Sequence, residues 1–178
     1  MIIQEAYHNV WKKLGHKSRR MAAAAFFEKG DHPDLTCDLK RDLAKVLNFR
    51  PETVQKLPPT NVAEHLSLRL KDERLHKYIE IVLVDYFLNE QVEMLSVFLD
   101  ELGIDHEKGK IEGDFEAPSK AHLIKAISAI SIRFPEEEVE GYLSTLYMCN
   151  GSGPWGNLPE AVKELLPEVS ARRAEVSD

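Results

Sequence analysis

The spacing of apolar residues predicts helices along almost the whole chain. Between 35 and 48, apolar side chains recur every three or four residues, the period that places them on one face of a helix. The same period predicts helices over 2–14, 19–29 and 119–134, and Pro135 suits the start of another. We therefore predict an all-α fold, a multi-helix bundle of about seven to nine helices.

The middle of the chain, 72–102, is predicted to be the central apolar helix or helix pair of this bundle. Its centre, 78–88, is apolar at most positions, so a helix there should be buried on most sides. The β-branched residues of this stretch also suit a strand, but no other segment offers a convincing strand partner. One polar stripe is formed by Glu73, His76 and Glu80, and a second, roughly opposite on a continuous helix, by Asp85, Asn89, Glu93 and Asp100. Either the exposed side switches, or the helix breaks, or some of the acids are buried, and we favour a break near Leu88 and Asn89.

Local signals add turns and helix starts to this picture. Residues 107–110 suit a small hairpin in a polar stretch. Ser18 is a predicted N-cap, because its hydroxyl oxygen can accept a free backbone N–H of the first helical turn, and Ser119 lies near the start of another helix. The Gly-rich segment 151–156 predicts a loop, with Trp155 packed onto the body of the protein.

Length and composition favour one helical domain over 1–168 and a frayed tail at 169–178. No apolar run approaches the roughly 20 residues that cross a bilayer, so no membrane association is expected. The two cysteines, Cys37 and Cys149, lie far apart in sequence. We expect both to be reduced thiols in a cytoplasmic protein.

The net charge of −7 is unevenly distributed along the chain. Residues 1–71 carry 13 Lys/Arg and 8 Asp/Glu, whereas residues 72–178 carry 10 and 22. This division suits either a basic part that faces a partner or halves that attract each other, within one chain or between two copies. We favour mutual attraction, because a molecule with a net negative charge repels polyanions at long range.

The segment 35–57 resembles a helix-turn-helix, a DNA-binding motif. Ala44 allows two helices to approach closely, and Asn48 tolerates the left-handed conformation of the turn. The sequence departs from the motif because Asn48 replaces the usual glycine and Pro58 shortens the second helix. The resemblance implies that four side chains face the major groove: Arg50, Glu52, Gln55 and Lys56.

A basic cluster spans the turn between the first two predicted helices. It is the strongest candidate surface for a polyanion, although clusters of this kind are often only solvated. Its members are Lys12, Lys13, His16, Lys17, Arg19 and Arg20.

Glu73, His76 and Glu80 are the candidate metal ligands. They share one face of a helix at spacings of three and four, and the Glu-x-x-His pattern occurs in di-iron carboxylate bundles. Charged stripes of this kind are more often solvated helix faces. Glu5 and His8 repeat the pattern, which the composition makes common by chance.

The acidic stretch 105–116 is spaced like a calcium loop at its ends, Asp105 and Glu116. The required glycine is out of register, because it stands at Gly109 and not at position 110. We therefore predict a solvated acidic loop here.

No motif in the chain names a reaction. The leading prediction is a non-catalytic helical interaction or regulatory protein that binds a protein partner or a second copy of itself. One alternative is a DNA-binding regulator that uses 35–57, and the other is a carboxylate/histidine metal-binding helical enzyme. No cofactor other than a metal is expected.

Overall fold

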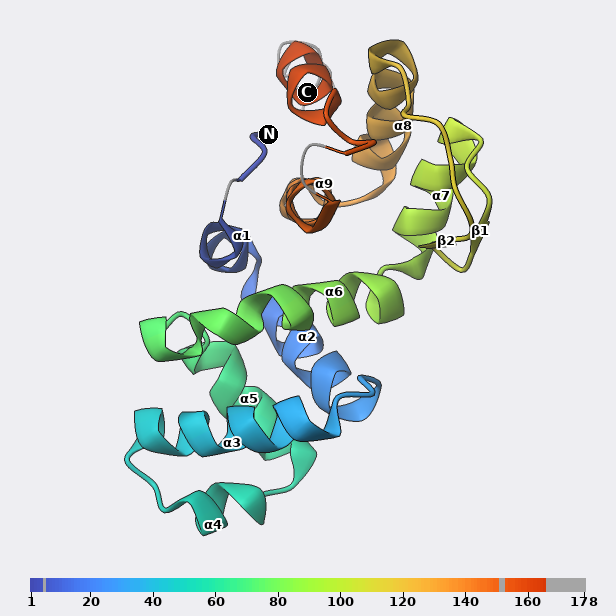
Figure 1. Cartoon of the computed structure of the whole chain (residues 1–178). Helices are drawn as coiled ribbons and strands as arrows, with labels where there is room; N and C mark the ends of the chain where they lie inside the picture. Colours follow the sequence, from blue (N-terminus) through green and yellow to red (C-terminus); the bar gives the residue numbers. More distant parts are fainter. Residues whose placement is uncertain (5, 151–152, 166–178) are drawn as a thin grey trace. The chain divides into compact units, whose positions relative to one another are not determined.

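A computed structural model describes residues 1–4, 6–150 and 153–165, and these residues are mostly helical (Figure 1). The all-α, multi-helix prediction is confirmed. The chain divides into two compact units, one formed by Tyr7–Glu90 and the other by Met1–Ala6 together with Gln91–Asp178. One domain over 1–168 stays a prediction, and the predicted tail at 169–178 lies outside the described residues.

The unit Tyr7–Glu90 is entirely helical between its connecting turns. Its elements are α1 (Tyr7–Lys13), α2 (His16–Glu28), α3 (Pro33–Leu47), α4 (Pro51–Gln55), α5 (Pro59–Arg69), the 3-10 helix η1 (Glu73–Tyr78) and α6 (Ile79–Glu90).

The core of this unit forms where α2 packs against α5 and α6 (Figure 1). Ala22, Ala23 and Ala25 are buried on α2, and these small side chains let the neighbouring helices approach closely. On α6, most residues from Ile79 to Phe87 are buried, which confirms the predicted interior helix. Residues 73–78 form a 3-10 helix, so the α-helical prediction is wrong for that stretch.

The second unit contains the hairpin and the last helices. Its elements are α7 (Val92–Leu102), β1 (His106–Glu107), β2 (Lys110–Ile111), α8 (Lys120–Arg133), α9 (Glu136–Asn150) and a helical stretch at 158–165. α7 packs against α8 (Figure 1), and β1 pairs antiparallel with β2 as the hairpin prediction requires. The Ser119 hydroxyl accepts the His122 backbone N–H and so caps α8, and Trp155 is fully buried.

The predicted helix break lies two residues later than expected. α6 ends at Glu90, Gln91 leaves the helical conformation with φ −114° and ψ 28°, and α7 begins at Val92. The break does not separate the two polar stripes by itself, because Asp85 and Asn89 remain on α6 with Glu80. Asp85 is buried, so the alternative of a buried acid also holds.

Two helix starts differ from the sequence predictions. Residues 1–4 are not helical, because the Gln4 backbone N–H donates to Ser144 Oγ at 2.9 Å and the Gln4 amide donates to Glu140 Oε1 at 2.8 Å. These bonds hold the segment against α9 instead of continuing a helix. Ser18 is not an N-cap, because α2 already begins at His16 after the extended residue Gly15.

Candidate interaction surface

The outer face of α2 gathers part of the predicted basic cluster. His16, Lys17 and Arg20 are exposed in the first turns of α2, and the buried alanines begin further along the helix at Ala22. We call these three residues the basic face. Lys12 and Lys13 on α1 are exposed, whereas Arg19 is half-buried and turned away from the three.

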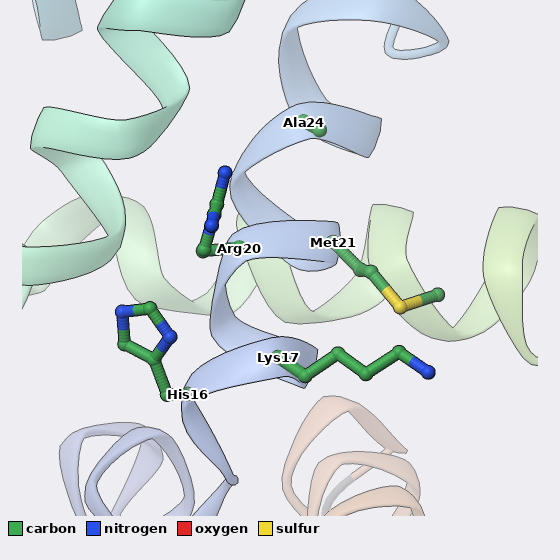
Figure 2. Close-up of a pocket in the computed structure, with 5 residues that line it drawn as sticks. All are labelled: His16, Lys17, Arg20, Met21 and Ala24. Atoms are coloured by element: carbon green, nitrogen blue, oxygen red, sulfur yellow. The ribbon is translucent and has the colours of Figure 1, made fainter.

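The basic face borders a shallow hollow of about 400 Å³, which Met21 and Ala24 also line. Figure 2 shows Lys17 and Met21 extending to one side of the helix and His16 and Arg20 to the other. The hollow therefore lies over the helix face between them, and the small Ala24 lines it one turn further along the helix. Three basic and two apolar side chains therefore line the same shallow surface.

The positive charge of this surface is not compensated. Residues 6–27 contain five Lys/Arg and no Asp/Glu, and the first turn of α2 holds no acidic residue. Within the described residues, Lys17 and Arg20 form no ion pair, whereas Lys29, directly after α2, pairs with Glu90 at 2.7 Å. Unpaired cations on one face attract anionic groups over about a Debye length.

Asp42 shows how this unit compensates cations elsewhere. Its carboxylate accepts from Lys45 Nζ at 2.8 Å, from Lys77 Nζ at 2.8 Å and from the buried Tyr78 hydroxyl at 2.9 Å. The hydrogen bond from Lys45, supported by those from Lys77 and Tyr78, holds the Asp42 pKa well below its usual range. This carboxylate therefore ties α3 to η1, and it pairs with both lysines.

The helix-turn-helix resemblance holds at the turn and fails at the second helix. Asn48 adopts the left-handed conformation with φ 55°, as expected, and Pro51 opens α4. However, α4 has only five residues and runs back along α3 (Figure 1), and the Gln55 amide donates to the Cys37 carbonyl near the start of α3 at 3.3 Å. In the motif, the second helix crosses the first at a steep angle.

The other three residues of the predicted DNA-binding set, Arg50, Glu52 and Lys56, are exposed. DNA binding by 35–57 stays a prediction, and the contacts of α4 match a helical hairpin better than a recognition helix.

The predicted metal ligands are not gathered into a site. Among the described residues, no group of three or more His, Cys, Asp or Glu side chains is arranged to hold a metal ion. Glu73 and Glu80 are exposed, and His76 Nε2 lies 3.0 Å from the Lys71 carbonyl oxygen. The His76 ring also stacks on His8 at 5.2 Å between centroids. These contacts stabilise the start of η1 and leave the three residues apart.

A buried His–Asp contact was not singled out from the sequence. Asp85 on α6 is buried, and its Oδ1 lies 3.3 Å from His32 Nε2. Gly30 makes this possible, because a Cβ there would lie 2.6 Å from Asp85 Oδ2. The available signal was an acidic residue inside an otherwise apolar helix. The pair anchors the connection between α2 and α3 to α6.

Comparisons with protein families, with curated proteins and with solved structures find no match to this chain. Within the described residues, no helix is both long and apolar enough to cross a bilayer.

Proposed function

We propose that this chain is a non-catalytic interaction module that binds an acidic segment of a protein partner at the basic face of α2. One observation carries the proposal. Two cations and a histidine surround a hollow with an apolar floor, and the cations have no ion-pair partner among the described residues.

The spacing of the basic face suits a peptide with several carboxylates. Lys17 and Arg20 are three residues apart on one helix, which places their Cβ atoms roughly 5–6 Å apart. Acidic residues three or four apart on a partner helix have the same separation. Met21 and Ala24 then offer an apolar side chain of the partner a place to pack, as in helix-in-groove recognition.

A nucleic acid is a weaker candidate for the same surface. Its affinity rests on neutralising many phosphates, and the chain as a whole carries a net charge of −7. The apolar floor formed by Met21 and Ala24 also contributes nothing to a phosphate backbone. An acidic protein segment uses both the cations and the floor.

Fluorescence anisotropy with a labelled acidic helical peptide, built from Glu, Ala and Leu, tests the proposal. We expect the full chain to bind this peptide and not its counterpart with every Glu replaced by Gln. Lys17→Glu/Arg20→Glu should weaken binding about tenfold to thirtyfold, because each reversal replaces an attraction of about 0.5 kcal/mol with a similar repulsion.

Arg50→Glu/Lys56→Glu is the matched control, because it makes the same change in net charge at two other exposed residues of the same unit. This control should change peptide affinity by less than about twofold, because salt screens exposed charges that lie away from the hollow. Equal weakening by both double variants, or tighter binding of a duplex DNA than of the acidic peptide, would overturn the proposal.

A further inference from the structure

The hairpin of the second unit is a firmly held, outward-facing element. Lys108 and Gly109 form its turn with φ 51° and 82°, the two positive values of the turn type that suits a two-residue hairpin. His106 Nδ1 accepts the Gly109 N–H at 3.2 Å, and His106 Nε2 lies 3.2 Å from Asp100 Oδ1. Gly109 packs directly on Leu95 of α7. These contacts hold the turn of the hairpin against α7.

The segment that contains the hairpin carries exposed negative charge without ion pairs to described residues, whereas α2 carries exposed positive charge. We call residues 105–116 the acidic loop. It has five exposed carboxylates and two lysines, and none of the five forms an ion pair with a described residue. The five are Asp105, Glu107, Glu112, Asp114 and Glu116.

The basic face and the acidic loop belong to different units, and the two units have net charges of opposite sign. Residues 7–90 carry 15 Lys/Arg and 12 Asp/Glu, whereas the remaining residues carry 8 and 18. A second copy of the chain therefore offers the basic face an anionic segment of complementary charge.

We propose that the acidic loop of one copy binds the basic face of another, so that copies of the chain associate head to tail. This inference rests on the proposed function and names its partner. The contact uses two different patches, so it is heterologous and can continue into a ring or a short chain of copies. Its attraction is between exposed charges, so salt weakens it.

A charge exchange between two variants tests this pairing. The first, Lys17→Glu/Arg20→Glu, loses the basic face and keeps the acidic loop. The second, Glu112→Lys/Asp114→Lys, loses the acidic loop and keeps the basic face. Glu64→Lys/Glu160→Lys matches the charge change of the second variant at exposed acids without ion pairs among the described residues. Sedimentation velocity on the full chains at low salt measures association.

We expect the unmodified chain and the control variant to associate with rising concentration at low salt, and to be monomeric at high salt. Each of the two test variants alone should stay monomeric, and their equimolar mixture should associate again. Monomers of the unmodified chain at every concentration, association of the second variant alone, or no recovery in the mixture would each overturn the pairing.

Binding of the Glu, Ala and Leu peptide separates this inference from the proposed function. A chain that stays monomeric but binds the peptide at the basic face refutes the pairing of copies alone. A chain that neither associates nor binds the peptide refutes both proposals.

Discussion

Asp42 collects donors from Lys45, Lys77 and Tyr78, and two of these lie more than thirty residues further along the chain. The sequence predicted residues whose role is local, such as the left-handed Asn48 and the serine at the start of α8. Asp42 and Asp85 were missed because their partners are brought to them by tertiary packing, which no local spacing reveals.

Asp42→Asn should lower the free energy of unfolding at pH 7 by about 1 kcal/mol, because two lysines lose their charged acceptor near the surface. The folded pKa of Asp42 is depressed, so its contribution is present above the unfolded value of about 4 and is lost as pH falls below it. Denaturant unfolding at pH 7 and at pH 3 should show a smaller difference between variant and parent at pH 3.

Asp38→Asn is the control for this measurement. Among the described residues, Asp38 forms an ion pair with Arg41 alone, at 2.9 Å, and both side chains are about half exposed. Loss of the Asp38–Arg41 ion pair should lower the free energy of unfolding by less than about 0.5 kcal/mol. An Asp42→Asn cost that stays the same from pH 7 to pH 3 would show that the ionised carboxylate does not supply the stability.

At the scale of elements, the three-to-four-residue spacing of apolar side chains predicted helices that bury one face. It was less informative where a helix also buries polar residues. α9 has eight consecutive buried residues, Glu138–Thr145, with two glutamates among them. An apolar stripe at helical spacing predicts this helix, and its members are Val139, Tyr142, Leu143, Leu146 and Tyr147. The burial of Glu138 and Glu140 beside the stripe could not be predicted from it. The predicted first helix begins before the observed one, because Ile2 and Ile3 continue the helical spacing of apolar residues. In the structure, Gln4 instead forms hydrogen bonds to α9.

The hairpin offers a sharp test at the same scale. Gly109→Ala should destabilise the protein by about 1 to 3 kcal/mol more than Gly113→Ala does, as measured by thermal or denaturant unfolding. Both glycines have positive φ, at 82° and 71°, so both variants carry similar backbone strain. Only at Gly109 would the new Cβ lie 2.6 Å from Leu95 Cβ, whereas nothing lies within 4 Å at Gly113. Equal costs would mean that the hairpin does not pack tightly on α7.

At the scale of the whole molecule, the sequence predicted the uneven charge but not which basic residues are available. The structure separates them by their partners: Lys45 and Lys77 are held by Asp42, while Lys17 and Arg20 are exposed beside a hollow without an ion pair among the described residues. The sequence cannot make this distinction, because basic residues with and without an ion-pair partner look the same in it.

The most direct measurement is a ¹H–¹⁵N correlation spectrum of the full chain during titration with the acidic Glu, Ala and Leu peptide. We predict that the largest shifts fall on residues 16–24, the stretch of α2 that lines the hollow, and that they disappear at high salt. Largest shifts on α4 around Arg50 and Lys56, or no shifts on α2 while the peptide binds, would contradict the assignment of the basic face as the binding surface.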